Sequence, residues 1–180
     1  MHLKQTMALA GILFATAFVG NALAADVGQL LNEANAMNYE EIQTAKTAKD
    51  KAGDNQSLTT YAETLKGDHE ANQQAVKTLS SQKNVKLESV SSEVDQKVKT
   101  LDKLDGGAFN TAFLKDEVTD HEKALSSFKS ARSHFRDDPD VELYIDQTIP
   151  ILKAHLEMAK NLENQMGTND NENPANNKKQ

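Results

Sequence analysis

The sequence predicts an all-α fold, a bundle of four long helices with a long, helix-containing crossover between the second and third. The 180 residues include no Trp and only 5% aromatic residues, while good helix formers such as Ala, Leu, Lys, Glu and Gln are abundant. Four long segments place apolar side chains at spacings of three and four residues, which is typical of amphipathic helices. Breaker or capping residues separate these segments.

The first 24 residues are expected to form a secretory signal peptide. Lys4 precedes an apolar run over residues 7–19 that is too short to span a bilayer comfortably, and an A-x-A cleavage site ends at Ala24. Cleavage before Ala25 would give a periplasmic or secreted protein with no integral membrane span. An uncleaved membrane anchor is the alternative, and the absence of a longer apolar run argues against it.

The expected mature chain is acidic. It keeps 19 of the 20 Lys and Arg residues, because Lys4 leaves with the signal peptide, against 27 Asp and Glu, so its net charge is −8 with neutral histidines. Nucleic-acid phosphates need a basic surface, and this balance therefore argues against a nucleic-acid partner. The sequence has no Cys, which excludes disulfides, thiolate metal sites and a lipid-modified cysteine.

The first two helices are expected over residues 26–52 and 57–82. Apolar residues recur at helical spacing along the first segment until the breaker run at residues 53–55. Ser57 is a suitable cap for the second helix, because its hydroxyl oxygen can accept a hydrogen bond from a free backbone N–H of the first turn. The short connection predicts that the two helices form an antiparallel pair.

The third and fourth helices are expected over residues 108–135 and 139–166. The breaker pair Gly106-Gly107 precedes the third helix. Asp138 is a good cap for the fourth helix, and Pro139 suits its first turn because proline lacks the N–H that would be unpaired there.

A long connection joins the second and third helices. Residues 83–107 contain a weaker amphipathic stretch of their own. A crossover of this length, with its own helix, suits the ferritin-like arrangement of a four-helix bundle. The bundle is then expected over residues 25–166, and the polar residues 167–180 are expected to form a disordered tail.

Each expected helix carries one metal-capable side chain on the face that should be buried. These interruptions of the apolar stripes are Glu41, His69, His121 and His155. With a rise of about 1.5 Å per residue, Glu41 and His69 lie roughly 18 Å from the first turn. His121 and His155 lie about 20 and 17 Å from the same end, if the crossover brings the third helix back to it. The four side chains are therefore expected to share one layer.

A buried layer of one carboxylate and three imidazoles must be satisfied by hydrogen bonds, by a metal ion, or by both. These donors suit Zn²⁺, Cu²⁺, Ni²⁺ or Fe²⁺, and the lack of thiolates disfavours Cu(I). Asn38 and Asn72, one turn from Glu41 and His69, are candidate hydrogen-bond partners for the ligands. The alternative is a metal-free polar network of the same residues.

Other carboxylates are less promising as ligands. Asp68 and Asp120 each precede a histidine, but neighbouring helix residues point about 100° apart. The residues three positions before the histidines are not acidic, so the Glu-x-x-His pairs of di-iron bundle proteins are absent; they are Lys66, Val118 and Leu152. The sequence leaves enzymatic activity open and favours a non-enzymatic role.

Several blocks of the sequence resemble an exported bacterial family known as domain of unknown function 4142. They occur in order over roughly residues 26–164, and include "NYEEI" (38–42), "GDHEAN" (67–72), "LDGGAFNTAFL" (104–114), "TDHEKAL" (119–125) and "IPILKAHLEMA" (149–159). The resemblance implies a ferritin-like helical fold and export. It also implies that Glu41, His69, His121 and His155 are the polar positions of these blocks, but it supplies no substrate.

Three hypotheses of function follow. The first is a metal-binding bundle with Glu41, His69, His121 and His155 as ligands, serving metal buffering or, by analogy with the family, envelope stress protection. The second is a metal-free interaction or stress-response module, with a buried His and Glu hydrogen-bond network. The third is an oxidase or peroxide-consuming metalloenzyme, which requires Glu41 to leave the metal and open a coordination position. The sequence does not identify a protein partner, and an oligomer remains open.

Overall fold

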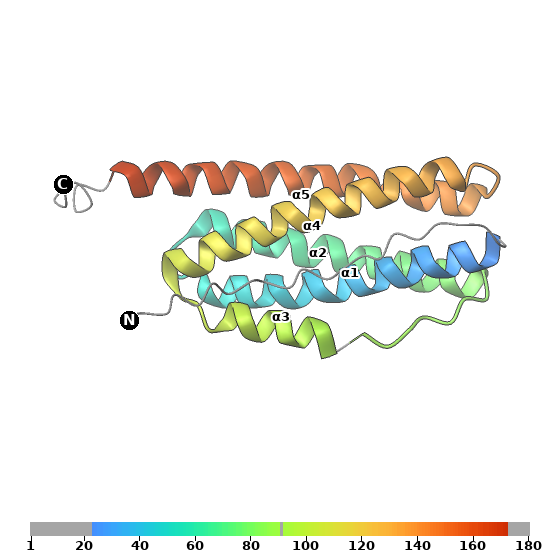
Figure 1. Cartoon of the computed structure of the whole chain (residues 1–180), viewed down its shortest axis with the longest axis horizontal. Coiled ribbons are helices and arrows are strands. Elements are labelled where there is room, and N and C mark those ends of the chain that lie inside the picture. Colours follow the sequence, from blue (N-terminus) through green and yellow to red (C-terminus); the bar gives the residue numbers. More distant parts are fainter. Residues whose placement is uncertain (1–22, 91, 173–180) are drawn as a thin grey trace, which may run out of the picture.

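The computed structural model describes residues 23–90 and 92–172, and these residues form five helices and no strand. The helices are α1 (Leu23–Lys51), α2 (Gln56–Gln82), α3 (Ser92–Asp102), α4 (Gly106–His134) and α5 (Pro139–Glu172). The all-α prediction is confirmed, and the expected helix within the crossover is α3. Figure 1 shows the four long helices lying side by side, with α3 along one flank.

The helix ends differ from the expected ones in three places. Asn55, not Ser57, caps α2, because its side-chain oxygen accepts a hydrogen bond from the backbone N–H of Leu58 at 3.0 Å. The pair Gly106-Gly107 opens α4 instead of preceding it, and Gly106 has a φ of +54°, which glycine adopts without strain. Asp138 caps α5 as expected, accepting from the backbone N–H of Val141 at 3.3 Å.

The third difference concerns the tail. Helix α5 continues to Glu172 rather than ending at residue 166, so residues 167–172 of the expected tail are helical. Residues 173–180 lie outside the described part of the chain, as do residues 1–22 of the expected signal peptide. No helix within the described residues is long and apolar enough to span a bilayer.

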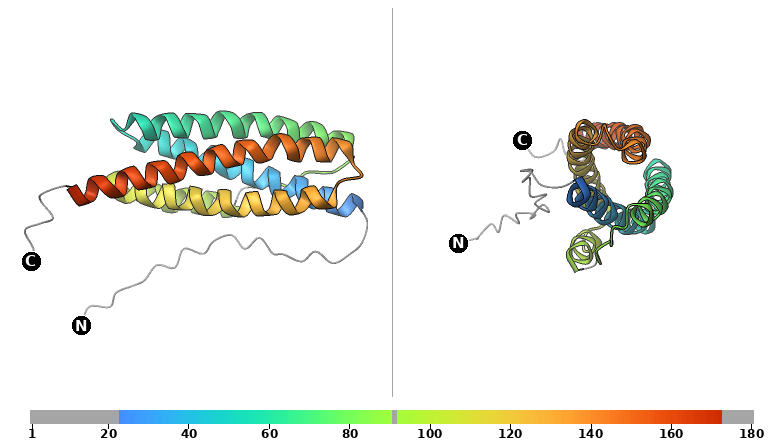
Figure 2. Two further views of the ribbon diagram at one scale, coloured as in Figure 1. Left: turned by 90° about the horizontal axis from the view of Figure 1, so that it is seen from above. Right: turned by 90° about the vertical axis from the view of Figure 1, so that its right-hand side faces the viewer.

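The four long helices surround a common axis, and α3 packs outside them. Viewed along the bundle in Figure 2, α1 lies beside α2 and α4 beside α5, while α3 lies outside the ring. The crossover returns the chain along the bundle, so α4 begins at the end where α2 begins (Figure 1). Helices α2 and α4 therefore run in the same direction, and the heights expected for the polar side chains can coincide.

The core consists of two apolar clusters, one at each end of the bundle. One joins the end of α1, the start of α2, the start of α4 and the end of α5, with Leu58, Tyr61, Leu65, Phe109, Phe113 and Leu114 among its members. The other joins the opposite ends of the same helices, with Leu31, Val76, Phe128, Phe135 and Ile145 among its members. Burial of these side chains stabilises the helices against one another. Between the clusters the core is polar.

Candidate metal centre

The three histidines predicted from the sequence meet in the middle of the core. His69 comes from α2, His121 from α4 and His155 from α5, and each is at most 2% exposed. Their ring centroids lie 5.3 to 5.8 Å apart. One nitrogen from each ring contributes to a group whose members all lie within 4.8 Å of one another. The apolar stripes put each ring on a buried helix face, and the return of α4 brings the faces to one height.

A hydrogen bond holds one nitrogen of every ring. His69 Nδ1 lies 2.9 Å from Asn38 Oδ1, and His121 Nδ1 lies 2.9 Å from the backbone carbonyl oxygen of Glu117. His155 Nε2 lies 2.9 Å from Asp68 Oδ2. These oxygens accept hydrogen bonds, so the three ring nitrogens donate. In the neutral imidazoles the remaining nitrogen then carries a lone pair: Nε2 of His69, Nε2 of His121 and Nδ1 of His155.

The lone pairs face one another rather than a donor. His69 Nε2 is buried and has no hydrogen-bond partner among the described residues. His121 Nε2 lies 3.3 Å from His155 Nδ1, although each ring already donates its proton elsewhere. Bonds of about 2.0–2.1 Å from a tetrahedral metal ion to two nitrogens place those nitrogens about 3.3–3.4 Å apart. The spacing between these two rings is therefore compatible with a shared ion.

Burial keeps two of the histidines, His69 and His155, in the neutral form that metal binding requires. It lowers the pKa of His69 well below its usual value, and the neighbouring His121 and His155 lower it further. Burial also lowers the pKa of His155, and the Asp68 carboxylate opposes part of that shift. A neutral imidazole binds a metal ion without first losing a proton, so metal binding at these two rings carries no cost of deprotonation.

Glu41 lies close to His121. Its side chain, on α1, is 3% exposed and forms a second close group with Glu117 and His121, in which the candidate ligand atoms lie within 4.8 Å of one another. The structure thus places Glu41 beside His121. The close group that the three histidines form does not include it.

Glu117 was missed by the sequence analysis. It is 2% exposed, its Oε2 lies 3.5 Å from His121 Nδ1, and the Tyr61 hydroxyl donates to the same oxygen at 3.4 Å. Burial raises the pKa of Glu117 well above its usual value, and the nearby Glu41 carboxyl raises it further. The available signal was the spacing of four residues to His121, which also puts two side chains on one helix face. Only the spacing of three was considered.

The predicted amide partners form a network behind His69. Asn38 Nδ2 donates to Asn72 Oδ1 at 2.8 Å, and Asn72 Nδ2 donates to the Thr148 hydroxyl at 3.0 Å. The Tyr144 hydroxyl also donates to Asn72 Oδ1 at 3.0 Å. Asn38, which lies one turn before Glu41 in the sequence, orients His69, and Asn72 orients Asn38.

Asp68 and Asp120 do not share one role. Asp68 accepts from His155 across the α2–α5 interface and so orients a ring, while Asp120 pairs with Lys97 of α3. From the sequence, both aspartates were candidates for direct ligands only. Such orienting contacts between helices are common around metal sites and fix which nitrogen faces the ion.

Comparison with known proteins gives a family but no activity. Neither the curated proteins nor the solved structures include a match to this chain. The sequence model of one family matches residues 15–162, which is most of the chain and covers every residue of the candidate site. The chain therefore belongs to the DUF4142 family, a domain of unknown function.

Proposed function

We propose that this protein is an exported, ferritin-like bundle that binds a divalent transition metal ion in its core through His69, His121 and His155. Glu41 is the nearby carboxylate that the sequence analysis counted as a fourth ligand. The observation that carries the proposal is the set of three inward lone pairs, one of them the unpartnered His69 Nε2. A buried imidazole nitrogen without a partner costs free energy, and a metal ion offsets that cost.

The donor set supports a particular class of ion. Three neutral imidazoles suit Zn²⁺, Cu²⁺, Ni²⁺ or Fe²⁺, and the sequence has no thiolate to favour Cu(I). Because the rings are buried between two apolar clusters, we expect a bound ion to exchange slowly with solvent. Slow exchange of this kind suits metal buffering or storage, or protection of the cell envelope under stress, better than turnover.

Export and the ferritin-like arrangement belong to the same proposal. Export is supported by the pattern of the first 24 residues, with its apolar run and A-x-A site. The ferritin-like arrangement is supported by the path of the chain, since one long crossover follows the second long helix and the helices on either side of it run in the same direction (Figure 1).

A second candidate, a metal-free interaction module, is favoured by the hydrogen-bond network behind His69. Asn38, Asn72, Thr148 and Tyr144 are joined by hydrogen bonds without any ion. In that case the histidine layer would serve only to fix the register of the helices. The unpartnered His69 Nε2 argues against it, because a network built for its own stability would pair that atom.

Metal analysis of untagged protein tests the choice. The full chain is purified without a histidine tag or chelator, and its metal content is measured. Its thermal unfolding is then followed without metal, with Zn²⁺, Cu²⁺ or Ni²⁺ in buffer free of reductant, and with Fe²⁺ under anaerobic conditions. We expect a bound ion and a rise in the unfolding temperature with at least one metal. No bound metal and no thermal shift with any of the four would reject the proposal in favour of the metal-free module.

A further inference from the structure

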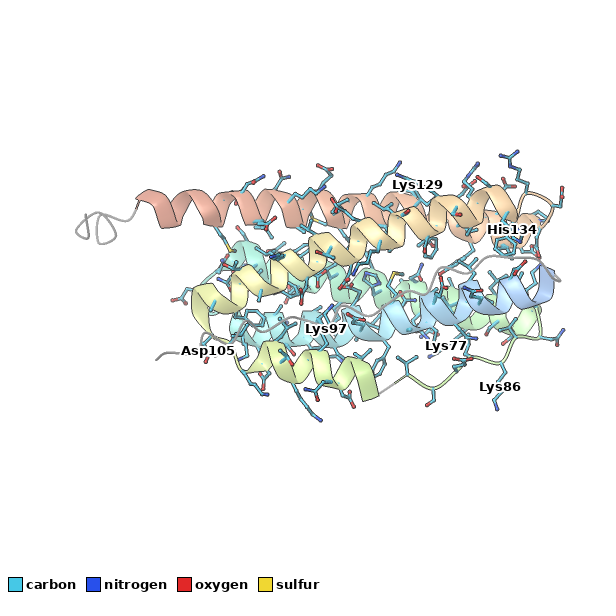
Figure 3. The ribbon with its side chains drawn as sticks, viewed as in Figure 1. Lys77, Lys86, Lys97, Asp105, Lys129 and His134 are labelled. Carbon is cyan, nitrogen blue, oxygen red and sulfur yellow. The ribbon has the colours of Figure 1, made fainter. Side chains whose placement is uncertain are left out.

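The interface between α1 and α4 carries an unusual number of carboxyl groups. Five acidic side chains of these two helices are buried or half-buried: Glu40 and Glu41 on α1, and Asp116, Glu117 and Asp120 on α4. Two lysines pair with this group among the described side chains. Lys97 of α3, labelled in Figure 3, contacts Glu40 and Asp120, and Lys123 lies 3.4 Å from Asp120. The acidic groups thus outnumber the cations that pair with them.

The two innermost carboxyl groups lack a cationic partner. In the described part of the chain, no lysine or arginine forms an ion pair with Glu41 or Glu117, and their one such contact is that of Glu117 with His121. Glu41 Oε2 is buried and has no hydrogen-bond partner there either. Two adjacent carboxyl groups held away from water repel one another when both are charged, and the cost falls when a cation lies between them.

The geometry around these groups is that of a ligand set. Oxygens of Glu41 and Glu117 lie within 4.8 Å of one another and of a ring nitrogen of His121, and the Tyr61 hydroxyl lies 3.4 Å from Glu117 Oε2. His121 separates the two groups, since its Nε2 faces His155 at 3.3 Å and its Nδ1 lies 3.5 Å from Glu117 Oε2. Its Nδ1 donates to the Glu117 carbonyl oxygen, so the second group offers mainly oxygen ligands.

We propose that Glu41 and Glu117 form a second cation subsite beside the histidines, so that the core holds two divalent ions of different chemical preference. The inference rests on the proposed function, because it places the second ion next to the first. Three imidazoles prefer Zn²⁺ and similar ions, whereas carboxylate and hydroxyl oxygens prefer harder ions such as Mn²⁺. Oε2 of Glu41 has no hydrogen-bond partner among the described residues, so this atom can bind an ion without losing a hydrogen bond of its own.

Sequential titration separates the two subsites. The metal-free full chain receives one equivalent of Zn²⁺ to fill the histidines, and Mn²⁺ is then added while the free Mn²⁺ signal is followed by electron paramagnetic resonance. We expect the wild type to retain one Zn²⁺ and to bind one Mn²⁺ per chain. Glu117→Gln, which keeps the shape of the side chain and removes its charge, should retain Zn²⁺ and weaken Mn²⁺ binding by at least about tenfold.

Asp116→Asn is the matched control. It removes the same charge from the neighbouring position of α4, where the side chain points about 100° away. We expect it to weaken Mn²⁺ binding much less than Glu117→Gln does. An equal loss in both variants would overturn the inference, because it would show general attraction by the acidic interface rather than ligation.

The outcomes distinguish the inference from the proposed function. Zn²⁺ binding without any Mn²⁺ binding by the wild type would overturn the second subsite and leave the histidine site in place. If the wild type bound neither ion, the second subsite would be overturned and Zn²⁺ would be removed from the ions proposed for the histidines. If Glu117→Gln fails to fold, as judged by lost Zn²⁺ binding, Glu41→Gln replaces it. If Glu117→Gln, or Glu41→Gln in its place, binds Zn²⁺ and keeps the wild-type Mn²⁺ affinity, the second subsite is likewise overturned.

Discussion

The apolar clusters at the two ends of the bundle differ from the polar layer between them in how their buried groups are satisfied. In one cluster the rings of Phe109 and Phe113 stack with centroids 5.8 Å apart, and Tyr61 packs against Phe113 at 6.1 Å. In the layer, Glu41 Oε2 and His69 Nε2 have no partner among the described residues. The clusters therefore stabilise the fold. The layer contains buried polar atoms whose hydrogen bonds are not made, and these atoms can bind a ligand.

The difference also appears in the direction of the contacts. The histidine rings donate hydrogen bonds on their outer sides, to Asn38 Oδ1, Asp68 Oδ2 and the Glu117 carbonyl oxygen. The inner sides face one another. A layer that served only to fix the packing of the helices would have hydrogen-bond partners on both sides of each ring. Substitutions that change stability and metal binding separately therefore test this difference between the layer and the clusters.

The largest expected effect is on stability and lies in an apolar cluster. Phe113→Ala removes a fully buried ring and should lower the free energy of unfolding of the metal-free protein by about 3–5 kcal/mol. Denaturant unfolding in the presence of chelator measures it. The folded variant should still bind Zn²⁺ with the wild-type stoichiometry. A stability loss below about 1 kcal/mol would contradict the assignment of the cluster as the main source of stability.

The next effect is on binding and lies in the layer. His69→Leu should weaken Zn²⁺ binding by at least about tenfold, because one of three imidazole ligands is lost. The metal-free variant should lose less stability than Phe113→Ala does, since Leu suits the apolar stripe of α2 but leaves Asn38 Oδ1 without its donor. Calorimetric titration and chelator-treated unfolding measure the two quantities.

His134→Leu is the control for that variant. His134 lies near the end of α4 and pairs with Asp26 at 2.8 Å, away from the layer. The same substitution there should leave Zn²⁺ affinity unchanged. Equal Zn²⁺ affinities in wild type and His69→Leu would remove His69 from the proposed site.

A smaller effect is expected when a ring loses its orientation but keeps its lone pair. Asn38→Ala removes the oxygen that holds His69 Nδ1, so the ring can turn and Zn²⁺ affinity should fall by up to about tenfold, less than in His69→Leu. Competition with a coloured chelator measures it. An Asn38→Ala loss larger than that of His69→Leu would mean that Asn38 matters for folding rather than for ligand orientation.

The smallest effect is the pH dependence of the metal-free protein. The folded-state pKa values of His69 and His155 lie below the unfolded value of 6.5, so the unfolded chain takes up protons first and stability falls as the pH drops through 6.5. The raised pKa of Glu117 acts in the opposite direction, because the folded state then holds a proton at a pH where the unfolded chain has lost it.

Glu117→Gln removes the opposing contribution. In chelator, its unfolding temperature should fall between about pH 8 and about pH 5 more steeply than that of the wild type. Thermal unfolding at a series of pH values measures the slopes. A flat profile for Glu117→Gln would contradict the view that the two histidines are buried in the neutral form.

The helices and the histidine layer were predictable because both depend on local periodicity. His69, His121 and His155 interrupt rows of apolar residues at spacings of three and four, which the sequence shows directly. Their positions along the bundle axis follow from residue counts. Glu117 was not predicted because it lies four residues before His121, whereas the Glu-x-x-His pattern of di-iron proteins has a spacing of three; both spacings share a helix face. The cap of α2 was misplaced because Asn55 and Ser57 are both good caps, and only backbone geometry decides between them.

What the sequence could not provide is the direction of the rings. The contact of His155 with Asp68 joins α5 to α2, and that of His69 with Asn38 joins α2 to α1. Such contacts depend on helix rotation and on side-chain rotamers, which periodicity does not determine. The same holds for α3, whose Lys97 reaches the acidic residues Glu40 and Asp120 only after the crossover has folded back.

The most direct test of the central claim is X-ray absorption spectroscopy of the full chain loaded with one equivalent of Zn²⁺. If the inward lone pairs of His69, His121 and His155 hold the ion, the spectrum should show three imidazole ligands with Zn–N distances of about 2.0–2.1 Å, and one imidazole fewer in His69→Leu. A shell of oxygen ligands alone, or a wild-type spectrum unchanged by His69→Leu, would contradict the claim that this layer is a metal centre.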